Sequence, residues 1–185
     1  MQLENAFHVD APVDRAWTLL NDVPRIVPCM PGAELSEVLD ENTWRATMKV
    51  KLGPISLQFG ADVMREEVDE AGRRVVLAAK ARELKGRGGA QATIESRLAP
   101  DGGGTHVSVT TDLTLQGAVA QYGRGVVGDV ASQLTGRFAE CLARQLTEER
   151  QVETPSAGEG VRPVGGLGLL LGAVWRSVVR FFRRR

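Results

Sequence analysis

Apolar and polar residues alternate with a period of two from Gly32 to Gln116. After Trp44, apolar side chains fall on every second position up to Leu52, and the pattern resumes at Ile55 after a Gly53-Pro54 turn. Because neighbouring side chains of a strand point to opposite faces, this pattern predicts an antiparallel sheet with one face in water. We expect strands at residues 3–9, 44–52, 55–63, 73–85, 90–99 and 105–115, separated by Gly- and Asp-rich turns.

The spacing becomes helical in two places. After Pro12, apolar residues recur at helical intervals up to Leu20, and Pro24 and Pro28 then allow only a short, broken helical piece. Residues 119–149 predict one long helix whose apolar face comprises Tyr122, Val126, Val130, Leu134, Phe138, Leu142 and Leu146. The expected fold is α+β: a curved antiparallel sheet of about seven strands wrapped around a long C-terminal helix, with two short helices after the first strand.

The inward positions of the expected sheet carry small side chains, namely Ala46, Ala61, Ala79, Ala81 and Ala92. Such a sheet under a long helix can enclose an apolar void, which is a ligand site by default, or helix and sheet can simply collapse together. The residues expected to face the void and bind a ligand are Trp44, Met48, Leu57, Phe59, Val63, Leu77, Val109, Leu113, Tyr122, Val126 and Val130.

Glycines are concentrated where the long helix is expected to begin, at Gly117, Gly123, Gly125 and Gly128. Each weakens a helix by about 1 kcal/mol relative to alanine, so the first turns are expected to be loose and could act as a gate over the void. The alternative is that these glycines allow close packing against the sheet. The GxGxxG match over residues 123–128 does not indicate nucleotide binding, because no strand follows the helix.

Composition excludes several classes of protein. The chain has 185 residues, 43% hydrophobic and 25% charged, with a formal net charge of zero, which argues against global disorder and against nucleic-acid binding through phosphate neutralisation. Cys29 and Cys141 lie far apart in the sequence, so we expect neither a disulfide nor a zinc site, and a reducing compartment. His8 and His106 have no partner at metal-ligand spacing, and no catalytic group or catalytic cofactor is expected.

The balanced charge hides an asymmetry along the chain. Residues 1–150 carry 17 Lys/Arg against 21 Asp/Glu, whereas residues 151–185 carry six Arg against two Glu. We therefore divide the chain into a domain (1–150), a flexible Gly/Pro/Ser-rich linker (151–166) and an amphipathic basic tail (167–185). The tail is expected to bind a membrane surface, with a protein groove or disorder as alternatives, through Leu170, Leu171, Trp175, Arg176, Arg180, Phe181, Phe182, Arg183, Arg184 and Arg185.

The order of elements resembles the START-like (SRPBCC) helix-grip fold, and within it the carbon monoxide dehydrogenase G-subunit family. The resemblance covers about residues 1–147. It rests on four motifs: Ala11-Pro12-Val13-Asp14-Arg15-Ala16-Trp17, Cys29-Met30-Pro31-Gly32, Gly53-Pro54-Ile55 and Gly117-Ala118-Val119-Ala120-Gln121-Tyr122-Gly123. The resemblance implies a molybdenum carbon monoxide dehydrogenase, or a related hydroxylase, as the partner.

The combined expectation is a non-enzymatic binding protein. It would hold a hydrophobic ligand, a respiratory quinone (menaquinone or ubiquinone) or another lipid, and carry it between the membrane and the dehydrogenase. The absence of a signal sequence at Met1 suggests a cytoplasmic protein, peripheral on the inner face of the cell membrane. The alternatives are a membrane recruiter or assembly factor without cargo and a cyclase-type enzyme.

Overall fold

The computed structural model describes residues 1–53 and 55–153. The expected tail, including all ten residues assigned to membrane binding, lies outside the described residues, as does most of the expected linker. The described part forms one compact unit, Met1–Glu153. Its last helix continues through Gln151 to Glu153 and therefore includes the first residues that the sequence assigned to the linker.

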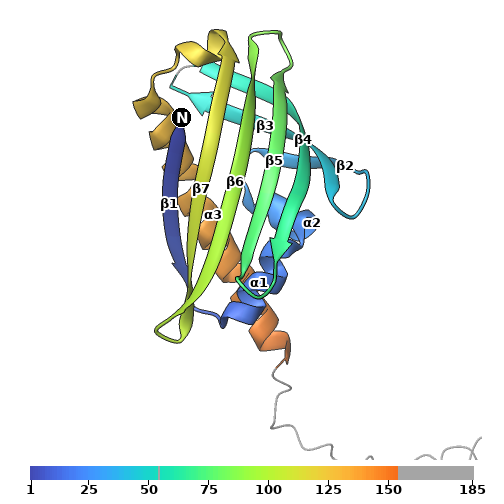
Figure 1. Cartoon of the computed structure of the whole chain (residues 1–185), viewed down its shortest axis with the longest axis vertical. Helices are drawn as coiled ribbons and strands as arrows, with labels where there is room; N and C mark the ends of the chain where they lie inside the picture. Colours follow the sequence, from blue (N-terminus) through green and yellow to red (C-terminus); the bar gives the residue numbers. More distant parts are fainter. Residues whose placement is uncertain (54, 154–185) are drawn as a thin grey trace, which may run out of the picture. The chain divides into compact units, whose positions relative to one another are not determined.

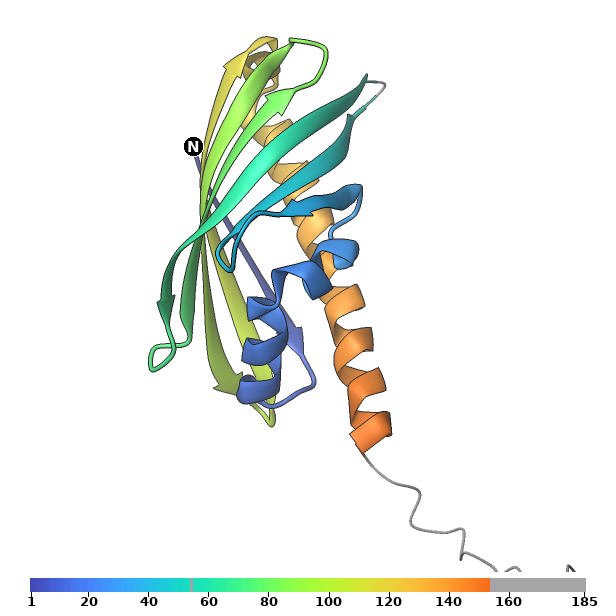
Figure 2. The same ribbon diagram turned by 90° about the vertical axis from the view of Figure 1, so that its right-hand side faces the viewer.

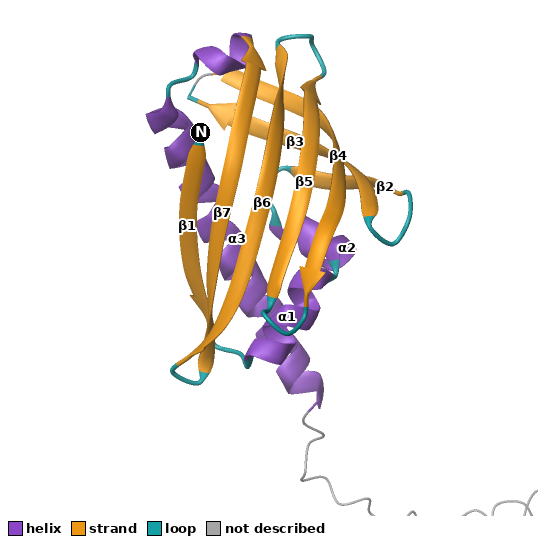
Figure 3. Ribbon diagram, in the orientation of Figure 1, coloured by secondary structure: helices purple, strands orange, loops and turns teal. Residues whose placement is uncertain are grey.

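Seven antiparallel strands form a single sheet in the order β1-β7-β6-β5-β4-β3-β2 (Figures 1 and 3). Every strand after β1 pairs with the next strand along the chain, and β1 closes the order by pairing with β7. Their bounds are β1 Gln2–Val9, β2 Ala33–Val38, β3 Thr43–Leu52, β4 Ile55–Asp69, β5 Arg74–Glu83, β6 Gly88–Asp101 and β7 Gly104–Gly117.

The helices occupy two stretches of the chain. Between β1 and β2 lie α1 (Val13–Asn21), α2 (Val23–Ile26) and the 3₁₀ turn η1 (Val27–Cys29). After β7 come the 3₁₀ turn η2 (Ala118–Gln121) and the long helix α3 (Arg124–Glu153). The helices α1, α2 and α3 lie on the same side of the curved sheet (Figure 2). We call the sheet face on this side the inner sheet face.

The fully buried core lies between the inner sheet face, α1 and the C-terminal half of α3. Its strand residues include Val9, Val75, Leu98 and Val107, and they pack against Trp17 and Leu19 of α1 and against Phe138, Leu142 and Leu146 of α3. The helix α3 packs chiefly against β1 and η1. Its N-terminal half is held by two polar contacts with β1: Ser132 Oγ to Asn5 Oδ1 at 3.2 Å, and Arg124 Nη2 to the carbonyl of Gln2 at 3.1 Å.

The predicted fold is confirmed, with two shifted boundaries. The long helix begins at Arg124, not near residue 119, because the chain first forms η2 and then leaves helical geometry at Tyr122 (φ −70°, ψ 118°). The apolar spacing continues through this break, which is why the pattern did not reveal it. The strand β4 continues past Val63 to Asp69.

The expectation that the two cysteines are unpaired is wrong. Cys29 and Cys141 form a disulfide, with 5.3 Å between their Cα atoms, although 112 residues separate them in sequence. The bond links the end of η1 to the middle of α3, and Cys29 belongs to the core. Distance along the chain does not limit contact in space, so the spacing had no bearing on the pairing, and the expected reducing compartment loses that support.

Candidate functional site: an apolar sheet face beside a polar cleft

Cross-strand pairing places most of the predicted ligand-binding residues on the inner sheet face. One row runs across five strands through Trp44, Val63, Ala79, Ala92 and Leu113. A second row places Met48 opposite Phe59. Residues directly opposite each other in antiparallel strands have Cβ atoms about 5 Å apart, so these side chains form a continuous surface. The alanines at its centre match the small inward residues that the sequence predicted.

This surface is less buried than the core below it. Among the candidate residues, Met48, Phe59, Val63, Leu113, Tyr122 and Val130 are only half-buried. Three others belong to the packed interior: Leu57 is 2% exposed, and Leu77 and Val109 pack against the core cluster. Trp44 is 3% exposed, whereas Val126 is 45% exposed. The N-terminal half of α3 therefore faces an apolar sheet surface that it covers incompletely.

The four candidate gate glycines lie in different settings. Gly117 ends β7 with φ +71°, and a Cβ on it would lie 2.8 Å from the Cα of Gly88, so this residue makes a close approach between strands. Gly123, Gly125 and Gly128 differ, because a Cβ on any of them would meet nothing within 4 Å. Gly123 precedes α3, and the other two lie in its first turns.

A buried carboxylate lies on the inner sheet face at the end that carries η2. Glu83 is 4% exposed, and its Oε2 accepts hydrogen bonds from the backbone amides of Lys85 (2.8 Å) and Arg87 (3.1 Å). Its Oε1 is buried without a hydrogen-bond partner. Burial acts to raise the pKa of Glu83, but the backbone amides of Arg87, Lys85 and Gln58 outweigh it and lower the pKa below the usual 4.5.

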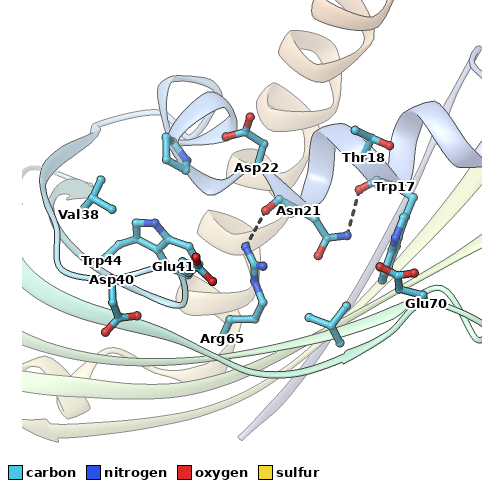
Figure 4. A pocket seen from close by; sticks show the side chains of 12 residues that line it. Trp17, Thr18, Asn21, Asp22, Val38, Asp40, Glu41, Trp44, Arg65 and Glu70 are labelled. Carbon is cyan, nitrogen blue, oxygen red and sulfur yellow. Dashed lines mark hydrogen bonds between the residues drawn. The ribbon is translucent and has the colours of Figure 1, made fainter.

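A cleft of about 600 Å³ adjoins the other end of the inner sheet face, between α1, α2, the β2–β3 turn and β4 (Figure 4). Two tryptophans, Trp17 and Trp44, form part of its wall, and both are largely buried. Its other lining residues are Thr18, Asn21, Asp22, Pro24, Val38, Asp40, Glu41, Arg65, Val68 and Glu70. Trp44 thus belongs to both the cleft and the apolar surface.

Arg65 projects from β4 toward α1 in this cleft (Figure 4). Its Nη2 donates a hydrogen bond to the backbone carbonyl of Asn21 at 2.6 Å, and its guanidinium lies 5.0 Å from the ring centroid of Trp44. The side chain of Asn21 donates from Nδ2 to the carbonyl of Trp17 at 3.0 Å. Arg65 Nε and Asn21 Oδ1 are both buried and lack hydrogen-bond partners.

Sequence reasoning identified the apolar surface but missed this cleft. It ended the fourth strand at Val63, and a charged residue two positions later did not fit an inward apolar pattern. A β-bulge between Arg65 and Glu67 lies at this place, where the pairing with β5 shifts. The available signal was Arg65 itself, an arginine in phase with the inward positions of a strand.

Two negative findings apply to the described residues. They contain no group of three or more His, Cys, Asp or Glu side chains arranged to hold a metal ion. Within the same part of the chain, no helix combines the length and the hydropathy needed to cross a membrane.

Comparison with solved structures shows the fold at low sequence identity. A conserved protein from Geobacillus kaustophilus is 18% identical with a TM-score of 0.72, over 80% of this chain and 97% of that one. The Zhui aromatase/cyclase from Streptomyces sp. R1128 is 17% identical (TM-score 0.58; 86% and 99% covered). A START superfamily protein from Mycobacterium smegmatis is 14% identical (TM-score 0.53; 80% and 98% covered).

Sequence comparison gives a more specific assignment. No curated protein matches the chain. Residues 6–147, which span the sheet, the short helices and most of α3, match the family model of CoxG, the G subunit of carbon monoxide dehydrogenase. The protein therefore belongs to the CoxG family of carbon monoxide dehydrogenase.

Proposed function

We propose that this protein is a carrier that holds a respiratory quinone, menaquinone or ubiquinone, against its inner sheet face. It takes the ligand between the cytoplasmic side of the cell membrane and a molybdenum carbon monoxide dehydrogenase, and so couples CO oxidation to the respiratory chain. The observation that carries this proposal is the half-buried apolar surface formed by residues such as Met48, Phe59 and Leu113 beside the N-terminal half of α3.

The chemistry of this surface suits an isoprenoid chain. An apolar surface left partly open to water is unfavourable, and covering it with hydrocarbon stabilises the complex by about 25 cal/mol for each Å² removed from water. Ala79 and Ala92 at its centre leave room that larger side chains would fill. A quinone tail is a long hydrocarbon, so it can cover several rows of the sheet at once.

The dehydrogenase partner follows from membership of the family, and the membrane step is assigned to the tail. The tail carries five of the six arginines in residues 151–185, in positions 176–185. An arginine close to an anionic membrane surface contributes about 1 kcal/mol of attraction. The protein is thus expected to attach peripherally and reversibly, as a carrier requires.

Native mass spectrometry with organic extraction tests the cargo. The full-length protein is expressed in a host that makes respiratory quinones and is purified without detergent. We expect a stoichiometric isoprenoid quinone in the extract. An empty protein whose tail still binds vesicles of anionic phospholipid would point instead to a recruiter or assembly factor, and a chemically altered ligand would point to a cyclase-type enzyme.

The membrane step needs its own test. Flotation with anionic vesicles compares the full-length protein with a variant in which Arg180, Arg183, Arg184 and Arg185 are replaced by glutamine. We expect the variant to lose flotation while keeping the same extracted ligand. Equal flotation of both proteins would remove the tail arginines from the proposal.

A further inference from the structure

We infer that the cleft around Arg65 binds the polar head of the apolar ligand, and that it selects a neutral head that accepts hydrogen bonds over an anionic one. This inference rests on the proposed carrier function and adds a specificity to it. It concerns the 600 Å³ cleft between α1, α2 and β4, not the apolar surface that would hold the tail.

The guanidinium of Arg65 has unused hydrogen-bonding capacity. Among the described residues, no carboxylate lies within ion-pairing distance of it; its charge faces the ring of Trp44 at 5.0 Å and one backbone carbonyl at 2.6 Å. Its Nε–H is buried without an acceptor. A buried donor without a partner is costly, so an oxygen atom of a ligand placed beside this side chain would be bound strongly.

Asn21 adds a second unpaired group at the same place. Its Oδ1 is also buried without a partner, and its backbone carbonyl is the group that holds Arg65. Both residues are half-buried and line the cleft, so a small side-chain rotation brings the unpaired atoms to its surface. A ligand oxygen can accept from Arg65, and a ligand hydroxyl can also donate to Asn21.

The charges around the cleft restrict what kind of head can enter. Four carboxylates, from Asp22, Asp40, Glu41 and Glu70, line the cleft together with the single arginine. Clefts lined by one sign of charge repel ligands of the same sign. A fatty acid or a phospholipid phosphate would be repelled by this rim, whereas a quinone carbonyl or a quinol hydroxyl carries no net charge.

The cleft is also placed correctly for a ligand whose tail lies on the apolar surface. Trp44 is common to both sites, and Arg65 follows Val63 by two positions on the same face of β4. Two residues along a strand span about 7 Å. A single molecule can therefore place its head beside Arg65 and its first isoprenoid unit beside Val63.

The two cleft tryptophans provide the measurement. Trp175, which lies outside the described residues, is replaced by phenylalanine so that the fluorescence comes from Trp17 and Trp44 alone. Titrations use decylubiquinone as the neutral head, dodecanoate as the anionic head and diphenylhexatriene as a hydrocarbon without a head. They are made on this background, on Arg65→Met, and on the control Arg45→Met, whose arginine is exposed and pairs with Glu37 and Asp62.

We expect decylubiquinone to bind more tightly than dodecanoate. Arg65→Met should weaken decylubiquinone binding by about tenfold or more, since one hydrogen bond to a charged group is lost, while diphenylhexatriene binding changes less than twofold. The Arg45→Met variant should match the background protein. If Arg65→Met does not fold, Arg65→Lys, which keeps the charge but loses the Nε–H beside Trp44, should weaken decylubiquinone binding selectively.

Two results overturn the inference. Tighter binding of dodecanoate than of decylubiquinone would show that the cleft does not select a neutral head. An equal loss of all three ligands in the Arg65 variants would show that the side chain only supports the fold. In both cases diphenylhexatriene still binds the background protein and the carrier function stands. Failure of all three ligands to bind the background protein removes the carrier function itself, and the inference with it.

Discussion

Cys29 and Cys141 are bonded to each other across 112 residues of chain, and Gln145, one turn further along α3, donates from Nε2 to the same sulfur of Cys29 at 3.3 Å. Gln145 also donates to the carbonyl of Arg25 at 3.3 Å. These contacts fix α2 and η1 against the C-terminal half of α3. Most disulfides of this kind belong to oxidising compartments, which makes the state of this bond inside the cell a question of its own.

Reduction of this disulfide is expected to lower the free energy of unfolding by about 2–5 kcal/mol, because cross-linking a loop of about 100 residues removes much of the entropy of the unfolded chain. Urea unfolding with and without dithiothreitol measures the difference. The double variant Cys29→Ala/Cys141→Ala should be insensitive to dithiothreitol. Equal midpoints for the wild-type protein under both conditions would mean that the bond adds nothing to stability.

Glu83 should make the protein sensitive to acid. Because its pKa is lower in the folded state than the usual 4.5, its stabilising effect is present above that pH and is lost as the pH falls through the folded-state pKa. The melting temperature of Glu83→Gln should therefore depend less on pH between 5 and 3 than that of the wild-type protein. Glu4→Gln, at an exposed position of β1, is the matched control and should keep the wild-type profile.

Gly125→Ala and Gly128→Ala should each stabilise α3 by about 1 kcal/mol, since alanine has the higher helix propensity and neither Cβ would meet another atom within 4 Å. If the first turns of α3 open to release ligand, both variants should also slow the exchange of decylubiquinone in stopped-flow measurements. Gly136→Ala, equally unobstructed but further along α3, is the control. It should stabilise the helix without slowing exchange; identical exchange in all three variants would contradict the gate.

Filling the apolar surface should displace the ligand. Ala92→Leu adds three carbon atoms at the centre of the inner sheet face, where the neighbouring side chains are only half-buried, so the fold can accept them while the ligand cannot. We expect the extracted quinone to fall severalfold with little change in melting temperature. Ala78→Leu, on the opposite sheet face, should retain the ligand. Equal retention in both variants would place the cargo elsewhere.

The features that the sequence predicted well are those that repeat along the chain. Alternation at positions such as Trp44, Met48 and Phe59 is a local consequence of strand geometry, so the sheet and its inner face could be predicted without knowledge of the packing. The long helix was predicted for the same reason. Its start was misplaced because the break at Tyr122 leaves the apolar spacing intact.

The features that were missed arise from contacts between distant segments. The disulfide depends on η1 reaching α3, and the cleft depends on Arg65 of β4 meeting Asn21 of α1, a separation of 44 residues. No periodic pattern reports such a contact. The β-bulge after Arg65 adds a local reason, since it interrupts the alternation that would have carried β4 to Asp69.

The pairing of β1 with β7 also sets a schedule for synthesis of the protein. Gln2 lies opposite Asp112, so the first strand to leave the ribosome waits until about 110 further residues have been added. At about 5–20 residues per second, that delay is about 5–20 s. Throughout that interval Phe7 and Val9, which later enter or contact the core, have no partner strand. The nascent chain therefore exposes an apolar strand until its C-terminal half arrives, and it is in this interval that a chaperone would be of most use to it.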